Sequence, residues 1–300
     1  TTNTDKKAAA PPSFPEPVVG VPIPADSGAP YPPPPLLIHT ISIPPSRCFR
    51  RSPQLTFSEA VDALFSASLP ENRPDLRNLS PEREDAELFV SYVERAFPVI
   101  TRSSSSTILA ARLSEDELKA LIAYKTEHPF PLYKWLNAHL NSSRRDGETV
   151  ERVGPFFTLL FRALEKLPKV RCKATRSVIV GDIPSLRAAF DNHTTGLPAG
   201  STINFWGCSS FSTSAAVVNK PTFMGGESED AILYSCAEME GCDMEPFSMP
   251  DAESEAEVLP LPPAAFKVIR TTMVGAKLTV EIQQVSNSHD AYVAPNAPVV

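Results

Sequence analysis

The chain has 300 residues, 42% of them hydrophobic, which suits one large domain or two modest ones with a substantial core. Its net charge of −7 and the lack of a basic, aromatic-rich stretch argue against a protein that binds nucleic acid. No run of about 18 apolar residues occurs, so we expect no membrane span.

The cysteines and histidines give no sign of a metal site. The five cysteines have no zinc-like spacing, and the five histidines form no HExxH pattern. Cys236 and Cys242 could pair only in an oxidising compartment, and free buried thiols are the simpler expectation. The chain starts at Thr1 without Met, which indicates a processed form or a fragment. We expect a soluble protein, cytoplasmic or secreted, and the sequence leaves its oligomeric state open.

Proline is concentrated in residues 1–55, which include the run Pro32–Pro35. Such a segment is typical of an extended arm or linker with polyproline character, because proline lacks the backbone donor that regular elements need. A docking peptide for a proline-binding module is the alternative. We also expect residues 286–300 to form a flexible tail.

Helical periodicity runs from Leu55 to Leu167, where apolar residues recur at a spacing of three to four. Ser114 followed by Glu117 has the form of a capping box. Five helices are expected: after Thr56, from Pro81, after Ser114, after 128–131, and over Pro155–Leu167.

Beyond Pro168 the pattern changes to short runs typical of strands, separated by Gly, Pro, Asn and Asp. The clearest are Arg176–Val180, Ser201–Trp206, Ala231–Tyr234, Val258–Leu261, Phe266–Thr271 and Leu278–Gln284. The sequence therefore predicts an α+β domain over 56–285, with a helical part over 56–168 and a β-rich part over 169–285.

Three carboxylates, Glu253, Glu255 and Glu257, alternate with other residues. In an extended chain, residues two apart point to the same face, so these glutamates would line one side of a strand. Like charges placed this way repel each other. Either the strand is a solvated edge, or two of the carboxylates have separate roles on one substrate.

Three motifs follow one another in the β-rich part. They are Lys173-Ala-Thr-Arg176-Ser-Val-Ile, then Gly200-Ser-Thr-Ile-Asn-Phe-Trp206-Gly-Cys-Ser-Ser-Phe-Ser-Thr-Ser214, and last the glutamate stretch. Each alone is a weak signal. In this order they resemble the arginine-specific mono-ADP-ribosyltransferases, which carry an Arg, a Ser-Thr-Ser-type strand and a Glu-x-Glu.

The resemblance extends over about residues 82–284 and includes segments between the motifs. These are Leu113-Ser-Glu-Asp-Glu-Leu, Ala123-Tyr-Lys-Thr, Leu132-Tyr-Lys-Trp-Leu-Asn137, Leu164-Glu-Lys-Leu-Pro168, Phe223-Met-Gly225 and Met244-Glu-Pro-Phe-Ser248. The resemblance implies an ADP-ribosyltransferase-like fold, with a split two-sheet β core that binds NAD and a helical N-terminal layer. It implies transfer of ADP-ribose from NAD to an arginine of a protein substrate, with release of nicotinamide and no metal.

The family resemblance also assigns roles to the two later glutamates. Glu257 would stabilise the oxocarbenium-like transition state and hold a ribose hydroxyl, because a fixed carboxylate favours developing positive charge. Glu255 would position the acceptor guanidinium and help remove its proton. Glu253 has no family role, and we expect it to be solvated.

Arg176 would pair with the NAD phosphates, and the backbone of Ser177 would hold the nicotinamide amide. Phe223 would flank the nicotinamide or belong to the core, and Phe247 is a candidate for a loop that contacts the acceptor protein. The sequence departs from the family at Thr175 and Ser177, where an aromatic residue and Gly are usual.

The serine that faces Glu257 is open between two registers. Read directly, Ser212-Thr-Ser214 is the motif and Ser212 is the key serine. The spacing to Phe223 favours Ser210 instead, with Cys208 where the family has an aromatic residue. Both serines would share one face of a strand, so both are candidates.

Two other functions remain open at this stage. In an NAD glycohydrolase, water would replace the arginine acceptor. A silent module would keep the fold and interact with partners without catalysis, which the departures at Thr175, Ser177 and Cys208 leave possible.

Overall fold

The structure is a computed structural model that describes residues 54–68, 81, 83–141, 147–181, 184–226, 229–250 and 252–285. The expected proline-rich arm, apart from Gln54 and Leu55, and the expected tail over 286–300 lie outside the described residues. All described residues belong to one structural unit, Pro34–Val300.

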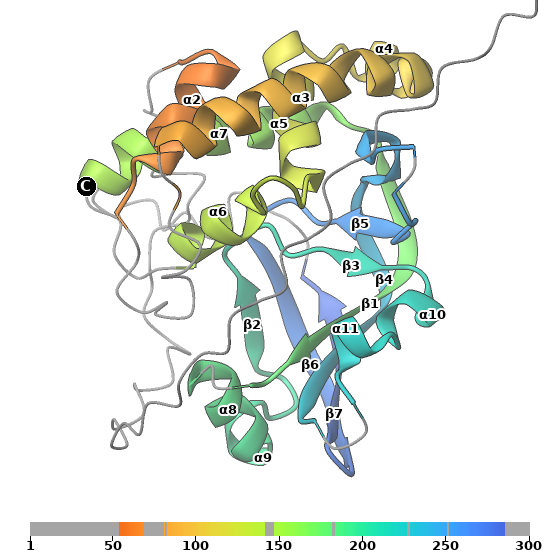
Figure 1. The fold of residues 1–300 in the computed structure, drawn as a ribbon. Coiled ribbons are helices and arrows are strands. Elements are labelled where there is room, and N and C mark those ends of the chain that lie inside the picture. Colours follow the sequence, from red (N-terminus) through yellow and green to blue (C-terminus); the bar gives the residue numbers. More distant parts are fainter. Residues whose placement is uncertain are drawn as a thin grey trace, which may run out of the picture. The chain divides into compact units, whose positions relative to one another are not determined.

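Helices come first along the described chain (Figure 1). They are α2 (Phe57–Phe65), α3 (Arg83–Ser103), α4 (Ser105–Ala111), α5 (Glu115–Lys125), α6 (Leu132–Leu140) and α7 (Gly147–Lys166). Thr56 caps α2 and Ser114 caps α5, each in a capping box with the glutamate three residues later. The capping box expected at Ser114 is therefore confirmed, and it satisfies amide groups that the first helical turn leaves unpaired.

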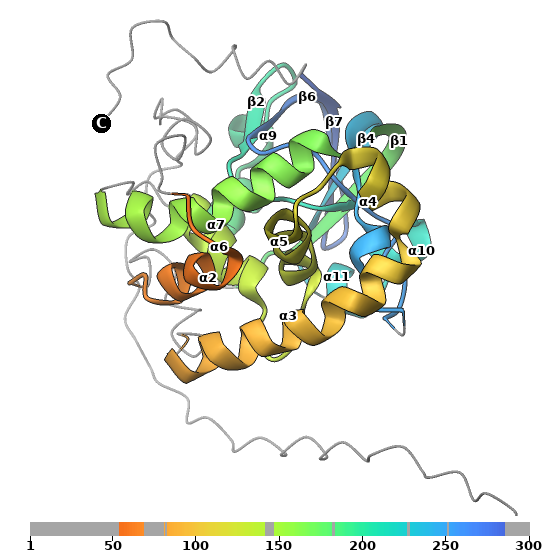
Figure 2. The same ribbon diagram turned by 90° about the horizontal axis from the view of Figure 1, so that it is seen from above.

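These helices form a layer with its own apolar core (Figure 2). Helix α2 packs against α7, and α5 packs against both α7 and α3. Trp135 and Phe156 are among the largest fully buried side chains in this layer. The same core includes Met244, Phe247 and Leu259 from the β-rich part, so the two parts share one packed boundary.

The helix boundaries differ from the sequence expectation in two respects. Helix α7 begins at Gly147, so Pro155 lies inside it rather than at its start. The expected helix from Pro81 is α3, and its first residue is Arg83. Five shorter helices were not expected, because their apolar runs are brief: α4, α8 (Pro184–Asp191), α9 (His193–Gly196), α10 (Ala215–Val218) and α11 (Pro221–Met224).

The strands are β1 (Lys169–Ile179), β2 (Thr202–Phe205), β3 (Phe211–Ser212), β4 (Ala231–Asp243), β5 (Glu257–Leu259), β6 (Ala264–Val274) and β7 (Lys277–Gln284). A short 3-10 helix, η3 (Glu245–Phe247), follows β4. Strands β1 and β4 are much longer than the runs expected from sequence, because their far ends contain charged and small residues that lack strand propensity.

The strands form one seven-stranded mixed sheet. Strands β1, β4, β7, β6 and β2 pair in that order, with β4 and β7 parallel and the other neighbours antiparallel. The short pair β3–β5 joins β1 on one side and β4 on the other, which closes a ring of pairings. The β core is therefore divided into a five-stranded array and a short pair, as expected for the α+β fold.

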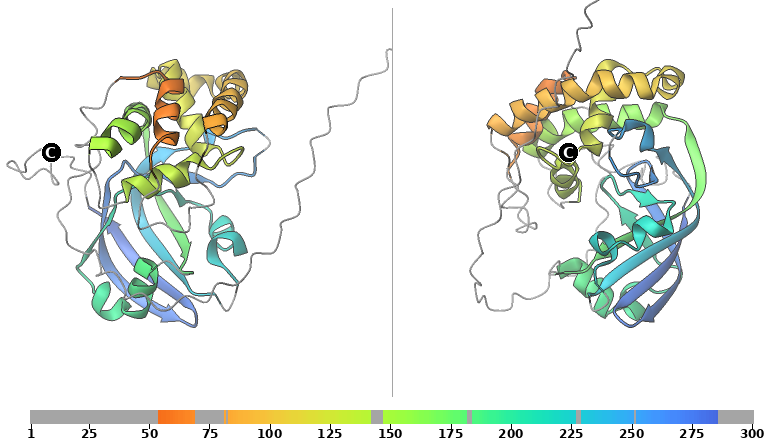
Figure 3. Two further views of the ribbon diagram at one scale, coloured as in Figure 1. Left: turned by 60° about the vertical axis from the view of Figure 1, so that its left-hand side comes forward. Right: turned by 45° about the vertical axis from the view of Figure 1, so that its right-hand side comes forward.

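A second apolar core lies within the β-rich part. Phe205, Phe211 and Phe266 pack their rings together, with centroids 5.5 to 5.9 Å apart. Figure 3 shows the helical layer at one end of the strands and α8 and α9 at the other. The short strands β3 and β5 lie at the end of the sheet that faces the helical layer.

Gly241 fixes the distance between β4 and β5. A Cβ atom at this position would lie 2.6 Å from Cγ1 of Val258 and 3.0 Å from the backbone of Leu259. Both contacts are shorter than ordinary packing distances, so only glycine allows β5 to approach this closely. Glu257 is the first residue of β5, so this packing helps to position its carboxylate.

We expect Gly241→Ala to displace β5 and to lower the free energy of unfolding by about 1–3 kcal/mol, as overpacked sites do. Chemical denaturation monitored by circular dichroism measures this change. Gly226→Ala is the control, because its nearest contact would be Glu229 Oε2 at 3.9 Å. Equal stability of the two variants would contradict the assigned role of Gly241.

Candidate active site

The three sequence motifs lie on three strands that pair with one another. Thr175 of β1 is the Cα partner of Ser212 of β3, and Ser212 is the partner of Glu257 of β5. Arg176 Nη1 donates a hydrogen bond of 2.8 Å to the carbonyl oxygen of Ser210. The Arg, Ser and Glu motifs, separated by more than thirty residues in sequence, are therefore brought together by strand register.

The glutamates are not arranged as the sequence suggested. Strand β5 begins only at Glu257, and Ala256 has a φ of 46°, in the left-handed region that side chains rarely adopt. The expectation that Glu253, Glu255 and Glu257 line one face of a strand is wrong, because the chain turns at Ala256. The carbonyl oxygen of Ala256 accepts a hydrogen bond of 2.9 Å from the amide of Thr213, which fixes the turn against β3.

Lys125 brings Glu255 and Glu257 together despite this turn. Its Nζ lies 3.2 Å from Glu255 Oε2 and donates a hydrogen bond to Glu257 Oε2. The Lys125 side chain is only 8% exposed, as is that of Glu257, whereas that of Glu255 is 45% exposed. The site therefore has a buried carboxylate and a half-exposed one that share a buried cation. Glu253 lies apart from them, exposed to solvent and paired with Lys220.

Glu245 orients the backbone on both sides of the turn. Its Oε1 accepts hydrogen bonds from the amide of Glu255 at 3.2 Å and from the amide of Glu257 at 3.3 Å. Glu245 belongs to η3, whose Phe247 is buried in the core of the helical layer. The Phe247 side chain is therefore not available to an acceptor protein, and contact of its loop with an acceptor stays a prediction. Lys125 and Glu245 both lie in segments that resemble the family, but nothing in their spacing indicated these contacts.

The pKa of the Glu257 carboxyl is raised, chiefly because burial disfavours its charged form. Lys125 opposes this shift by charge and by hydrogen bonding, Glu255 adds to it by repulsion, and the Ser210 hydroxyl opposes it by donating a hydrogen bond. The same two glutamates raise the pKa of Lys125 although burial alone would lower it. Lys125 therefore carries its charge at neutral pH.

The two candidate serines have different partners. The Ser210 side chain lies near the Glu257 carboxyl and lowers its pKa, whereas Ser212 Oγ donates a hydrogen bond of 2.6 Å to the backbone oxygen of Glu255. Strand β3 begins at Phe211, so the expectation that both serines share one face of a strand is wrong. Ser210 is therefore the serine that acts on the Glu257 carboxyl, and Ser212 supports the turn beside it.

Arg176 presents a buried donor with no partner. Its Nε is buried and has no hydrogen-bond partner, and burial lowers the pKa of its guanidinium. Tyr124, Tyr234 and Glu257 lie close enough to raise that pKa in part. An unpaired buried N–H group is costly, so a ligand that supplies an anionic acceptor would be stabilised here. The NAD pyrophosphate expected at Arg176 fits this requirement.

Helices α5 and α6 hold the loop that precedes Ser210. Asn137 of α6 accepts from the Cys208 amide at 2.7 Å and donates to its carbonyl oxygen at 2.9 Å. The Tyr124 hydroxyl of α5 donates to the same oxygen at 2.9 Å. A Cβ on Gly207 would lie 2.6 Å from Asn137 Oδ1, so glycine lets the loop approach the helix. The helical layer therefore sets the position of the serine motif.

These features agree with a comparison against protein families. A family model described as "NAD:arginine ADP-ribosyltransferase", abbreviated ART, matches residues 70–290. The chain belongs to the ART family. It is thus an ADP-ribosyltransferase, and NAD is its substrate.

Solved structures of ADP-ribosyltransferases and effectors are similar in fold to this ART-family chain. The type III effector XopAI from Xanthomonas axonopodis pv. citri is 14% identical with a TM-score of 0.51, over 78% of this chain and 85% of that one. The ADP-ribosyltransferase Vis from Vibrio splendidus, solved with agmatine, is 19% identical with a TM-score of 0.48, over 70% of this chain and 89% of that one. A search of curated proteins finds no match.

Ser177 and Phe223 are the remaining residues that the sequence assigns to the site. Ser177 Oγ donates a hydrogen bond of 2.9 Å to the carbonyl oxygen of Phe223, which connects β1 to α11. Phe223 is 36% exposed, so it does not belong to the core and its ring is open to a ligand. Whether Phe223 flanks nicotinamide stays a prediction.

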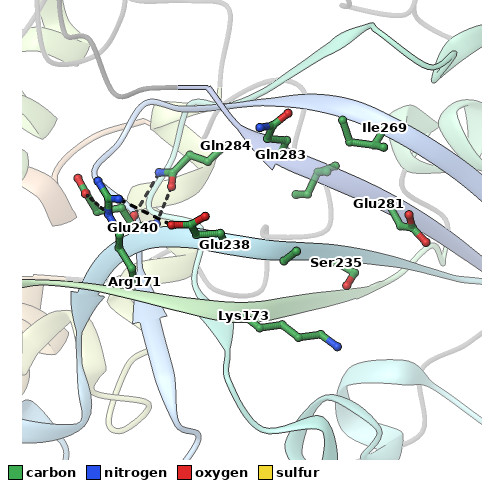
Figure 4. A pocket seen from close by; sticks show the side chains of 11 residues that line it. Arg171, Lys173, Ser235, Glu238, Glu240, Ile269, Glu281, Gln283 and Gln284 are labelled. Carbon is green, nitrogen blue, oxygen red and sulfur yellow. Dashed lines mark hydrogen bonds and ion pairs between the residues drawn. The ribbon is translucent and has the colours of Figure 1, made fainter.

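A groove of about 850 Å³ lies elsewhere on the sheet (Figure 4). Arg171 and Lys173 line it from β1 and alternate with Ala174 and Arg176, so the groove is on the opposite face from the active site. Arg171 pairs with Glu240 at 3.3 Å, and Gln284 bonds to the Glu240 backbone. The groove is therefore lined by charges that largely neutralise one another.

Other site types find no support among the described residues. No group of three or more His, Cys, Asp or Glu side chains in the described ranges could hold a metal ion. In the same part of the chain, no helix combines the length and apolar character needed to cross a bilayer. Cys236 and Cys242 are both free thiols, so the alternative of a disulfide between them is wrong.

We expect the Glu257 carboxyl to titrate above its ordinary pKa of 4.5. Ser210→Ala should raise this pKa further, because it removes a hydrogen bond that favours the ionised form. Ser212→Ala is the control and should leave it nearly unchanged. Carbon-detected NMR titration of the carboxyl measures both. A larger shift in the Ser212 variant would contradict the assignment of Ser210 to Glu257.

Proposed function

We propose that this ADP-ribosyltransferase transfers ADP-ribose from NAD to an arginine side chain of a protein and releases nicotinamide. The observation that carries the proposal is the pairing of a buried carboxylate, Glu257 of β5, with a half-exposed one, Glu255, which lies just before β5. Strand β3 joins β5 to β1, which holds Arg176. One carboxylate is placed to act inside the site, and the other is placed to meet a residue that arrives from solvent.

Arg176 binds NAD in this proposal. Its guanidinium is permanently charged, and its unpaired buried Nε offers a donor to a phosphate oxygen. Hydrogen bonds to charged groups are worth about 1.5–3 kcal/mol, so this contact is large enough to matter for affinity. The backbone of Ser177 and the exposed ring of Phe223 are assigned to the nicotinamide end of the ligand.

Glu257 stabilises the transition state. The bond between the nicotinamide nitrogen and C1′ of the ribose breaks, and its electron pair leaves with nicotinamide. Positive charge develops on the ribose ring, and a carboxylate held in a water-poor site stabilises this charge more than it stabilises the ground state. Burial raises the pKa of the Glu257 carboxyl, and Lys125 and then Ser210 oppose this shift, which favours the ionised form that this role requires.

Glu255 acts on the acceptor. An arginine guanidinium is almost always protonated and is a poor nucleophile, so a neighbouring carboxylate has to orient it and accept its proton. A guanidinium nitrogen then forms a bond to C1′, and the proton goes to Glu255. The exposure of the Glu255 side chain supports this assignment, because a protein substrate has to reach it.

NAD glycohydrolase is the second candidate, and one contact favours it. Glu255, the carboxylate assigned to the acceptor, already lies 3.2 Å from the ammonium of Lys125. Water is neutral and does not need this carboxylate to be free. Hydrolysis of NAD would therefore proceed even if the Lys125 ammonium repels a cationic acceptor from Glu255.

Variants of the two glutamates test the division of roles. Glu257→Gln should lower nicotinamide release by about 10²–10³-fold with or without acceptor, because it removes the charge opposite the oxocarbenium ion. Glu255→Gln should abolish transfer to agmatine but retain hydrolysis. Chromatography of nicotinamide, ADP-ribose and ADP-ribosyl-agmatine separates the activities. Equal loss of both activities in both variants would contradict the proposed roles.

Replacement of the buried arginine tests the NAD contact. Arg176→Ala should raise the KM for NAD by about 10–100-fold, as expected for the loss of hydrogen bonds to a charged group. Arg171→Ala is the matched control, since it lies on the same strand but lines the groove on the opposite face. Steady-state kinetics of nicotinamide release give both values. An unchanged KM in the Arg176 variant would exclude this residue from NAD binding.

A further inference from the structure

The structure assigns Lys125 a role in acceptor selection: we infer that its ammonium occupies the Glu255 carboxylate and disfavours a cationic acceptor there. The acceptor subsite, defined here as the Glu255 carboxylate and the Lys125 ammonium, then binds a guanidinium only by displacing Lys125 or by sharing the carboxylate with it. This inference rests on the proposed function, because it concerns the acceptor of that reaction.

The position of Lys125 between the two glutamates supports a role in acceptor selection. Lys125 bridges Oε2 of both glutamates, and its side chain is almost completely buried. Glu257 is equally buried, so an acceptor from solvent meets Glu255 first. The ammonium therefore contacts the one of these two carboxylates that is open to an incoming side chain.

Lys125 is held in place by its helix. It is the last residue of α5, where the chain leaves the helix at Thr126, whose hydroxyl donates a 2.8 Å hydrogen bond to the Ile122 carbonyl. The preceding residue, Tyr124, is buried and bonded to the serine loop. The backbone near Lys125 is therefore fixed on both sides, which limits how far its ammonium can withdraw.

The charges around the acceptor subsite explain why a cationic acceptor is disfavoured relative to a neutral one. Glu245, Glu255 and Glu257 supply negative charge around this subsite, while Lys125 and Arg176 supply positive charge. A bound guanidinium would add a third positive charge next to Lys125. Two like charges a few ångströms apart in a poorly solvated site repel each other strongly enough to change binding by about tenfold or more. A neutral acceptor avoids this repulsion.

Lys125 also explains how Glu257 tolerates burial. Removing one partner of a buried ion pair leaves an uncompensated charge, which is strongly destabilising. A substitution should therefore remove the charge but keep a hydrogen-bond donor. Glutamine does this, because its amide can still donate to the Glu257 carboxylate.

The test measures ligand binding, so it does not depend on turnover. Nα-acetyl-arginine amide and Nα-acetyl-citrulline amide differ in the charge of the terminal group, and calorimetry measures their Kd. Lys125→Gln should tighten binding of the arginine compound by about tenfold and leave the citrulline compound nearly unchanged. Lys125→Arg keeps the charge and should bind both compounds as the unsubstituted chain does.

Lys119→Gln is the matched control. Lys119 lies on the same helix, is equally buried at 8% and also contacts two glutamates, Glu94 and Glu115, each at 2.6 Å. This variant removes a comparable buried cation without touching the acceptor subsite. It should therefore leave the Kd of both compounds unchanged, which separates local charge from a general loss of stability.

The unsubstituted chain gives a second measurement if Lys125→Gln does not fold. The arginine compound should shift the Lys125 side-chain NMR signals at saturation, and the citrulline compound should not. An equal Kd for the arginine compound in folded Lys125→Gln and in the unsubstituted chain would overturn the inference, as would equal NMR shifts with both compounds.

Turnover with NAD is measured in a separate experiment, so that failure of the proposed function can be distinguished from failure of the inference about Lys125. In folded Lys125→Gln the ratio of transfer to hydrolysis should rise by about tenfold with agmatine as acceptor. If the unsubstituted chain forms no ADP-ribosyl-agmatine, the proposed arginine transfer fails, while the binding result still decides the role of Lys125. If it is active and the ratio does not change, the inference fails alone.

Discussion

The burial of the Glu257 carboxylate is the constraint on which the rest of the site depends. A buried negative charge is tolerated only with partners, and here Lys125 comes from the helical layer while Ser210 comes from the loop before β3. Each partner is in turn held by its own contacts. The boundary between helices and strands therefore serves both the stability of the fold and the charge state of the site.

The register of the strands brings the three sequence motifs together at the site. The ring of pairings among β1, β3, β5 and β4 places the Arg, Ser and Glu motifs next to one another. Gly241 and Gly207 allow close approach where a side chain would separate these elements. Motifs that are far apart in sequence thus lie side by side, because short strands pair with one another and two glycines allow close packing.

Much of this could be predicted from the sequence. Helical periodicity and the capping box at Ser114 indicate the helical part, and the ordered motifs resemble the ART family, because these signals are local or follow chain order. The Lys125 contact could not be predicted, since Lys125 and Glu257 are 132 residues apart and meet only through tertiary packing. The period of two in the glutamates suggested a strand, but the left-handed turn at Ala256 overrides that preference.

The central claim is that the chain transfers ADP-ribose from NAD to arginine. Incubation with NAD and agmatine, followed by mass spectrometry, tests it most directly. The account predicts ADP-ribosyl-agmatine together with free nicotinamide, and loss of the adduct in Glu255→Gln. Free ADP-ribose without any adduct at saturating agmatine would contradict arginine transfer and indicate an NAD glycohydrolase.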